Sequence, residues 1–416
     1  MKGVLVIIDG LADRACRLLG EKTPLETAKK PNLDYFSENS QLGYIYPVHE
    51  DFVPGTSEAI VSLFAQNWED YPRGWLEAIG EGIELEKGDL ALRANFATID
   101  NLKDKNVIDR RAGRTLTTKE AKILAKEINK IFLPRKFIFK PTLQHRAVLV
   151  LRGGFSDEIT EMDPAHHPTN KSETGKFKFC EALEEDENAE YTANMLNEFI
   201  EKVFLRLDKH PVNESRRKKG FYPANIILPR APGISIKKIT KYKKWACSTS
   251  IPVMKGMCKC LGINLFEFKA VEFKNHDVYA NIKKNLELEI KKAISLLKKK
   301  KSQFDYFLIY LKETDVPGHD NLPLEKKEMI ELIDRKLFSF LRKFTEKNKI
   351  KIAVTADHST PCSLKQHSAD PVPVLLFDAN KTENAEKSGA FNEAEAKKGS
   401  LGKMYGKEFL KKIGFG

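Results

Sequence analysis

Three aspartates and three histidines stand at positions where metal ions could be bound. They are Asp9, Asp315, His319, Asp357, His358 and His367. Carboxylates and imidazoles together suit Mn²⁺, Zn²⁺ or similar divalent ions, and six ligands are too many for one catalytic ion. Two neighbouring ions would hold the attacking and the leaving oxygens of a phosphoryl group. These residue types therefore indicate a two-metal site for phosphoryl chemistry.

Each of these residues also has an ordinary structural interpretation. Asp9 with the glycine after it is typical of a turn, Asp357 and His358 could form a capping motif, and His367 could be a surface histidine. The metal interpretation gains its strength from position, because three separate predicted strands each end in such side chains.

A second chemical candidate is the stretch VPGTSEAIVSLF, residues 53–64, where two hydroxyl residues follow Pro-Gly. A tight turn that presents Thr56 or Ser57 at the start of an apolar helix can display a nucleophile. The same pattern is an ordinary helix start, because Ser and Thr cap helix N-termini well. The nearby metal ligands favour a nucleophile here, and the residues alone leave open which hydroxyl acts.

The elements that must position these residues alternate between strand and helix. Apolar runs at residues 4–8, 304–311 and 350–359 predict buried strands, and the spacing of apolar residues predicts helices at 281–301 and 326–344. Buried strands that alternate with helices are typical of an α/β fold, a parallel sheet with helices on both faces. Ligands bind such sheets beyond the carboxyl ends of the strands, where the six candidates are expected.

The middle of the chain contains many charged residues, which predicts an inserted domain. With 416 residues the chain is long for one compact core. We expect a core built from residues 1–75 and 233–416, with 76–232 as a smaller α+β domain. Within it we predict a helix at 118–131, a strand pair within 137–154, and surface loops at 184–190 and 207–223.

Composition limits the possible partners and compartments. A formal charge of +12 suits either nucleic acid or a small anionic substrate, and no nucleic-acid-binding motif accompanies it. We therefore do not favour nucleic-acid binding as an interpretation of the charge. No run approaches the roughly 20 apolar residues of a membrane span. The opening MKGVLVIIDG predicts a first strand rather than a signal peptide, and six scattered cysteines suit a reducing, cytoplasmic setting.

The sequence resembles the archaeal-type, cofactor-independent phosphoglycerate mutases of the alkaline phosphatase superfamily, nearly end to end. The motifs that carry the resemblance are PGTSEAIVSLF, IDRRAGR, ANIILPRAPG, PVMKGMCKCLGI, KETDVPGHDN, TADHSTP and HSADPVPVLLF. The resemblance implies an alkaline-phosphatase-like, mostly parallel sheet flanked by helices, with an inserted substrate-binding domain. It also implies interconversion of 3-phosphoglycerate and 2-phosphoglycerate through a phosphoenzyme and two divalent metals, with a small phosphorylated anion as substrate.

The same resemblance implies a role for individual residues. One metal would be held by Asp315, His319 and His367, and the other by Asp9, Asp357, His358 and the nucleophile oxygen. An ungapped alignment anchored at Ala59 places Thr56 at the nucleophile and leaves Ser57 to cap the following helix. The implied substrate-binding residues are Arg93, Asn95, Arg110, Arg111, Arg114, Arg230 and Lys255, of which Arg230 and Lys255 are also expected to take part in catalysis.

Two departures from the family pattern bear on specificity. The family usually has Pro-Gly-Ser-Asp where this chain has Pro-Gly-Thr-Ser, and Trp75 stands where the family commonly has proline. A metal-dependent phosphomonoester or phosphonate hydrolase on the same site therefore remains an alternative, as does a non-catalytic protein that binds anions or nucleic acid. The sequence does not select among Mn, Zn, Mg and Co, and it does not give the oligomeric state.

Overall fold

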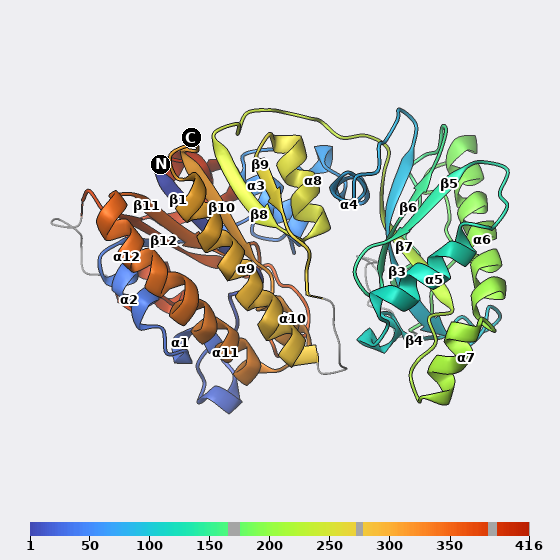
Figure 1. The fold of residues 1–416 in the computed structure, drawn as a ribbon, viewed down its shortest axis with the longest axis horizontal. Helices are drawn as coiled ribbons and strands as arrows, with labels where there is room; N and C mark the ends of the chain where they lie inside the picture. The colour runs from blue at the N-terminus through green and yellow to red at the C-terminus, as the bar shows by residue number, and fades with distance from the viewer. Residues whose placement is uncertain (165–174, 272–277, 382–388, 416) are drawn as a thin grey trace.

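The fold contains two β-sheets, each with its own helices, and Figure 1 shows them as two lobes. The computed structural model describes residues 1–164, 175–271, 278–381 and 389–415. The larger sheet has eight strands in the order β13-β2-β12-β11-β1-β10-β8-β9. Its strands are β1 (Gly3–Ile8), β2 (Gln41–Tyr46), β8 (Trp245–Thr249), β9 (Asn264–Glu267), β10 (Tyr306–Leu311), β11 (Lys351–Thr355), β12 (Val372–Asp378) and β13 (Gly402–Tyr405).

The centre of the large sheet is parallel, as the apolar runs predict. All six residues of β1 are buried, and the strand pairs in parallel with β10 on one side and β11 on the other. The exception is β12, which runs antiparallel to both β11 and β2. The sheet is therefore mostly rather than wholly parallel, and the strand predicted at 350–359 ends at Thr355, just ahead of Asp357 and His358.

The large lobe also contains helices, including α4 (Arg73–Gly80) at its junction with the small lobe. They are α1 (Pro24–Thr27), α2 (Pro31–Glu38), α3 (Thr56–Leu63), α4 (Arg73–Gly80), α8 (Pro252–Leu261), α9 (Val278–Lys300), α10 (Asp315–His319), α11 (Pro323–Ile333), α12 (Ser339–Asn348), α13 (Glu393–Lys398) and α14 (Phe409–Lys412). In Figure 1, α9, α11 and α12 lie across the same face. The single helix predicted at 326–344 is instead α11 and α12 joined by a π-helical turn, Asp334–Phe338. The turn directs the buried Asp334 carboxylate to the N–H groups of Asn32 and Leu33 at the start of α2.

The smaller sheet is antiparallel throughout and lies within the predicted insertion. Its strands are β3 (Leu90–Ile99), β4 (Val107–Asp109), β5 (Phe137–Pro141), β6 (Arg146–Leu151) and β7 (Ile226–Gly233). Its helices are α5 (Thr118–Ile128), α6 (Glu187–Leu207) and α7 (Pro211–Lys218). They enclose a second apolar core with the sheet. The predicted helix and strand pair are thus present, whereas the domain boundaries at 75 and 232 stay a prediction.

The two loops predicted in this lobe are largely helical. Residues 184–190 contain the start of α6, where the Asp186 side chain accepts the Ala189 N–H as a cap. Residues 207–223 contain α7, which has a proline at its first position. The prediction failed because the polarity of α7 suggested solvent, while its Arg216 side chain is buried and donates to the carbonyl oxygens of Thr115 and Tyr222.

Helix α4 contacts both lobes through glycines that permit close backbone approach. A Cβ at Gly74 would lie 2.2 Å from the carbonyl oxygen of Ala91 in β3. A Cβ at Gly80 would lie 1.9 Å from the carbonyl oxygen of Pro252 in α8. Residues larger than glycine are excluded at both positions, so the sequence of α4 holds the two sheets together.

Two predictions from composition can be compared with this fold. Among the described residues, no helix has both the length and the apolar character needed to cross a bilayer. All six cysteines are free thiols, and all except Cys16 are buried.

Candidate metal centre and substrate-binding site

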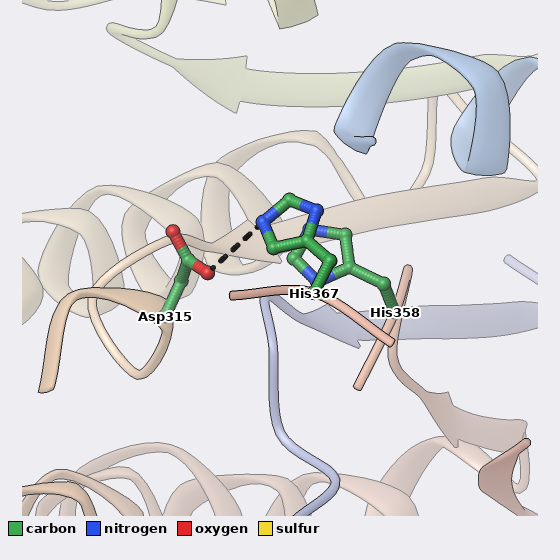
Figure 2. Close-up of side chains that lie close together, drawn as sticks. All are labelled: Asp315, His358 and His367. Atoms are coloured by element: carbon green, nitrogen blue, oxygen red, sulfur yellow. Dashed lines mark ion pairs between the residues drawn. The ribbon is translucent and has the colours of Figure 1, made fainter. Parts of the chain in front are cut away.

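The six predicted ligands lie together at one edge of the large sheet; we call them the metal-ligand cluster. Adjacent strands β1, β10 and β11 end at this edge, and Asp9, Asp315 and Asp357 follow them. His367 comes from before β12, and because β12 is antiparallel to β11, its start lies where the parallel strands end. Figure 2 shows His367 directed at Asp315, with the His358 ring beside it.

The cluster contains two overlapping groups of possible ligands. In one, His358 Nε2 lies 3.2 Å from Asp9 Oδ1 and 3.5 Å from Asp357 Oδ2. In the other, Asp315 Oδ1 lies 3.4 Å from His319 Nε2 and 3.5 Å from His367 Nε2. The rings of His358 and His367 stack with centroids 3.6 Å apart. His358 also comes within ligand range of Asp315 and His367, so it lies between the two expected groups.

The imidazoles are oriented as metal ligands usually are. His319 and His367 use Nδ1 to contact the backbone carbonyl oxygens of Lys365 and Pro54, both at 2.9 Å. A carbonyl only accepts, so Nδ1 carries the proton and Nε2 is free to bind a cation. His358 Nδ1 contacts the Thr360 hydroxyl at 3.1 Å, which likewise leaves Nε2 facing the carboxylates.

Unpaired buried atoms and the local charge show that these residues fit divalent cations. Asp9 Oδ1 and His358 Nε2 are buried and lie 3.2 Å apart, and neither makes a well-directed hydrogen bond among the described residues. Burial favours neutral imidazole, yet the neighbouring carboxylates of Asp357 and Asp9 raise the pKa of His358 to about 9. Burial and the nearby Asp9 charge raise the pKa of Asp357 to about 6. The cluster therefore concentrates negative charge that a bound cation would neutralise.

A buried ion pair behind the cluster fixes the loops that carry it. Lys326 in α11 is fully buried, and its Nζ lies 2.8 Å from Asp13 Oδ2. The same ammonium donates to the carbonyl oxygens of Ala12 and Thr360. Thr360 in turn donates to Asp315 Oδ1 at 2.9 Å. This ion pair thus ties the loop after β1 to the loop after β11.

The candidate nucleophile lies beside the metal-ligand cluster. Thr56 is the first residue of α3 and is almost fully buried, and the N-cap position belongs to Gly55, without a side-chain cap. Ser57 is the second helical residue and donates to Glu58 Oε1 at 3.0 Å. The expectation that Ser57 caps this helix is therefore wrong, because a Ser57 cap requires the helix to begin at Glu58 and it begins two residues earlier, at Thr56.

Two residues at the end of β10 contact the carboxylates of the cluster, and sequence reasoning missed both. The Tyr310 phenol donates to Asp9 Oδ2 at 2.6 Å and also lies 3.1 Å from Asp357 Oδ2. The Tyr310 phenol lines the same cavity as Thr56. Lys312 Nζ lies 2.8 Å from Asp9 Oδ2. The run FDYFLIYL indicated only a buried strand, and a tyrosine within it resembled core.

A cavity in front of Thr56 is lined in part by three arginines and by the glutamate that pairs with two of them. The described residues that line it are Thr56, Arg73, Glu77, Arg93, Arg146, Ile251, Pro252, Val253, Tyr310 and Lys312. Glu77 Oε1 lies 3.1 Å from Arg73 Nε and 3.3 Å from Arg93 Nε. Of these arginines only Arg93 was expected. Arg73 begins a helix and Arg146 begins a strand, so both resembled solvent-facing charges.

Further arginines of the small lobe adjoin this cavity wall. Arg230 lies opposite Arg93 in the β3–β7 register, and its Nη1 is 3.2 Å from Asp163 Oδ2. Arg110 binds the same buried carboxylate through two hydrogen bonds of 2.6 and 2.8 Å. Asn95 is buried, and its Oδ1 has no hydrogen-bond partner among the described residues. We call Arg73, Arg93, Arg110, Arg111, Arg146 and Arg230 the arginine cluster.

The arginine cluster has the electrostatics of an anion-binding site. Burial lowers the pKa of Arg230 to about 10, and the nearby charge of Arg73 adds to the effect. Burial together with Arg114 and Arg110 likewise lowers the pKa of Arg111 to about 10. A phosphate or carboxylate would relieve this repulsion, and arginine grips such groups with two parallel hydrogen bonds.

Comparison with known proteins identifies the family of this chain. A profile of the 2,3-bisphosphoglycerate-independent phosphoglycerate mutase family matches residues 37–213. The enzyme of that name from Pyrococcus furiosus is 39% identical, over 98% of this chain and 95% of its own length. This chain is a cofactor-independent phosphoglycerate mutase family member. A second relative of the same description, from Methanocaldococcus jannaschii, is 36% identical over 99% of this chain and 96% of its own.

Solved structures extend the likeness to the fold of the mutase family. A protein from Pyrococcus horikoshii superposes with a TM-score of 0.75 at 29% identity, covering 100% of this chain and 98% of the other. The cofactor-independent phosphoglycerate mutase from Thermoplasma acidophilum gives 0.56 at 28% identity, with 99% and 98% covered.

Three residues singled out by the mutase pattern lie apart from the cavity lining. Lys255 on α8 is held between Glu81 and Glu267, with both Nζ–Oε distances 3.4 Å. Arg114 reaches across to the large lobe and donates to Asp320 Oδ2 at 2.6 Å. Trp75 packs in a small apolar cluster, and its Nε1 donates to the Asp89 carbonyl oxygen. Trp75 therefore does not line the cavity that the structure describes.

Proposed function

We propose that this protein interconverts 3-phosphoglycerate and 2-phosphoglycerate through a phosphoenzyme at Thr56. The observation that carries the proposal is the position of Thr56. Its side chain lines a cavity together with three arginines and with Tyr310, which hydrogen-bonds Asp9 of the metal-ligand cluster. A nucleophile between cation ligands and anion-binding side chains suits transfer of a phosphoryl group from a small anionic substrate.

We assign two divalent ions to the metal-ligand cluster. Asp315, His319 and His367 would hold one, and Asp9, Asp357 and His358 would hold the other together with the Thr56 oxygen. When bound, such ions lower the pKa of the Thr56 hydroxyl and neutralise charge on the phosphoryl group. The donor set is compatible with Mn²⁺, Zn²⁺, Mg²⁺ or Co²⁺.

The residues of the chain account for the remaining steps. Arg73, Arg93 and Arg146 bind the phosphate and hold the phosphorus in line with Thr56 Oγ1. As the Thr56 oxygen gives up its proton and bonds to phosphorus, the bond from phosphorus to the glycerate oxygen breaks. That oxygen takes up one proton, so the transfer leaves the number of protons unchanged. The glycerate turns within the cavity, and its other hydroxyl takes the phosphoryl group from Thr56 while returning a proton.

Retention of glycerate separates a mutase from a hydrolase. We propose that Arg230, Arg110, Arg111 and Asn95 bind the glycerate carboxylate and hydroxyls during this reorientation. The contact between Arg114 and Asp320 spans the two lobes and would help to keep water from the phosphoenzyme.

A coupled assay and rapid-quench labelling test this proposal. With phosphate-labelled 3-phosphoglycerate and Mn²⁺, the wild type should produce 2-phosphoglycerate and transient acid-stable label on Thr56. Thr56→Ala should abolish both, and the matched variant Ser57→Ala should retain both. Free phosphate without 2-phosphoglycerate would instead establish the hydrolase, and label on Ser57 would contradict the assignment of Thr56.

A further inference from the structure

Lys312 adjoins both groups of metal ligands and also the cavity. It follows β10 directly, and its Nζ lies 2.8 Å from Asp9 Oδ2 and 3.8 Å from Asp315 Oδ2. In the proposed function these two carboxylates hold different ions. The Lys312 side chain also lines the cavity together with Thr56. One ammonium group is therefore shared between the metal-ligand cluster and the cavity.

The ammonium and the imidazoles face different oxygens of the same carboxylates. His358 Nε2 lies 3.2 Å from Asp9 Oδ1. His367 Nε2 lies 3.5 Å from Asp315 Oδ1. Lys312 instead approaches the Oδ2 atom of each aspartate. Its contacts do not use the oxygens that face the imidazoles, so this chain can hold the ammonium and a cation at the same time.

Lys312 has hydrogen-bond donors that the protein leaves unused. An ammonium group carries three N–H donors. Among the residues that the structure describes, Asp9 Oδ2 is the one acceptor within hydrogen-bond reach of Nζ, because Asp315 at 3.8 Å is too distant. The side chain is only 18% exposed. A largely buried ammonium with spare donors in a cavity lined by arginines is suited to bind the oxygens of an anion.

We propose that Lys312 is a catalytic residue that donates hydrogen bonds to the phosphoryl group as it passes to and from Thr56. This inference rests on the proposed function. Lys312 keeps its proton throughout, and no covalent bond to it forms or breaks. Because Asp9 holds Nζ beside the metal-ligand cluster, the ammonium stays at the position of bond exchange when the glycerate turns. It therefore stabilises the transferring group in both half-reactions.

The first test is Lys312→Met, which removes the charge and keeps most of the side-chain volume. We expect kcat to fall by about 10²- to 10³-fold, as for the loss of one donor to a developing oxyanion. Rapid-quench rates for the formation and the breakdown of the phosphoenzyme should fall by similar factors. The matched control is Lys351→Met at the start of β11. Its Nζ lies 3.9 Å from Asp378 Oδ2, and its loss should leave both rates unchanged.

Anion binding separates this role from that of a structural counter-ion for Asp9. Orthovanadate adopts the five-coordinate geometry of a phosphoryl group in transfer, and calorimetry gives its affinity for the Mn²⁺-loaded protein. Lys312→Met should weaken vanadate binding by about 10²-fold. The affinity for glycerate, the Mn²⁺ bound at saturation and the unfolding temperature should stay close to wild type.

Lys312→Gln provides a second variant, because its amide can still donate to Asp9 without a charge. We expect it to fold as the wild type does and to bind vanadate as weakly as Lys312→Met. Wild-type vanadate affinity in either variant would overturn the proposal. Loss of Mn²⁺ in place of loss of vanadate would overturn it as well, because Lys312 would then act only on the metal ligands.

The proposed function and this inference can fail separately. If wild-type protein forms no phosphoenzyme on Thr56, the proposed function fails before any lysine variant is made. If phosphoenzyme forms equally fast in wild type and in Lys312→Met, only the role of Lys312 is refuted.

Discussion

The metal-ligand cluster and the arginine cluster both bury like charges, but they hold them in different ways. Asp9, Asp315, Asp357 and His358 follow the ends of β1, β10 and β11, while His319 ends α10 and His367 precedes β12. Backbone carbonyls fix the rings of His319 and His367. The arginines are long side chains from α4, β3, β6 and β7 and the segment after β4. The metal-ligand cluster therefore gathers its side chains at one position, whereas the arginine cluster surrounds a cavity.

Four of the six arginines are held in pairs by buried carboxylates. Glu77 contacts Arg73 and Arg93, and Asp163 contacts Arg110 and Arg230. Each arginine still has donors to spare, because a guanidinium carries five N–H groups. We infer from this difference that bonds are made and broken at the metal-ligand cluster. The arginine cluster would keep its hydrogen bonds to a substrate that must turn. The variants below challenge this division.

Loss of a metal ligand is expected to have the largest effect. Asp357→Ala or His367→Ala should lower kcat by roughly 10³-fold or more, because charge stabilisation worth several kcal/mol is lost. Chelation of the wild type should do the same, and added Mn²⁺ should restore activity. Asp370→Ala, which removes a carboxylate that pairs with Arg14 at the surface, is the control. Full mutase activity in either ligand variant would refute the metal assignment.

Loss of one cavity arginine should be less severe and should appear in binding. Arg93→Ala should lower kcat/KM by about 10- to 100-fold, since hydrogen bonds to charged groups contribute about 1.5–3 kcal/mol. Metal content should be unchanged. Arg152→Ala, whose partner is Asp89 outside the cavity lining, should leave kcat/KM near wild type. Equal losses in the two variants would mean that Arg93 acts through folding.

Loss of the ion pair between the lobes should change the ratio of the two products more than the rate of turnover. Arg114→Ala should raise phosphate release relative to 2-phosphoglycerate formation by about fivefold, because a partly exposed pair contributes up to about 1 kcal/mol. Asp320→Asn should have a similar effect, and the double variant should add little. Additive effects would show that the two residues act independently.

Lys255 is expected to show the smallest effect. Its ammonium is already paired with Glu81 and Glu267, so Lys255→Met should change kcat/KM by less than about threefold. A loss above about 10²-fold would place Lys255 at the substrate, as the family resemblance implies, and would require its ion pairs to break during turnover.

The sequence predicted the metal-ligand cluster better than the arginine cluster for a physical reason. Asp9, Asp315 and Asp357 each follow a buried strand, and parallel neighbours bring such positions together whatever the details of packing. Arg73 and Arg146 start elements far apart in sequence, and only the crossing of α4 with the small sheet brings them to one cavity. Nothing in their local pattern distinguishes them from surface charges.

The same limit applies to Tyr310 and α7. A tyrosine in an apolar strand usually contributes to the core, and only the contact with Asp9 reveals a polar role. A charged segment after a proline usually lies in solvent, and only the buried Arg216 reveals that α7 packs against the rest of the lobe. In both cases the partner is distant in sequence, so no local pattern could have identified it.

The buried Lys326 offers a reporter for loop opening. Its ammonium is enclosed by Asp13 and by the backbone of the loops after β1 and β11. An amine-reactive reagent can reach it only when α11 separates from those loops. Under native conditions the rate of Lys326 modification, read by mass spectrometry, therefore measures how often this edge of the sheet opens. Surface lysines such as Lys130 would react at once and provide the internal reference.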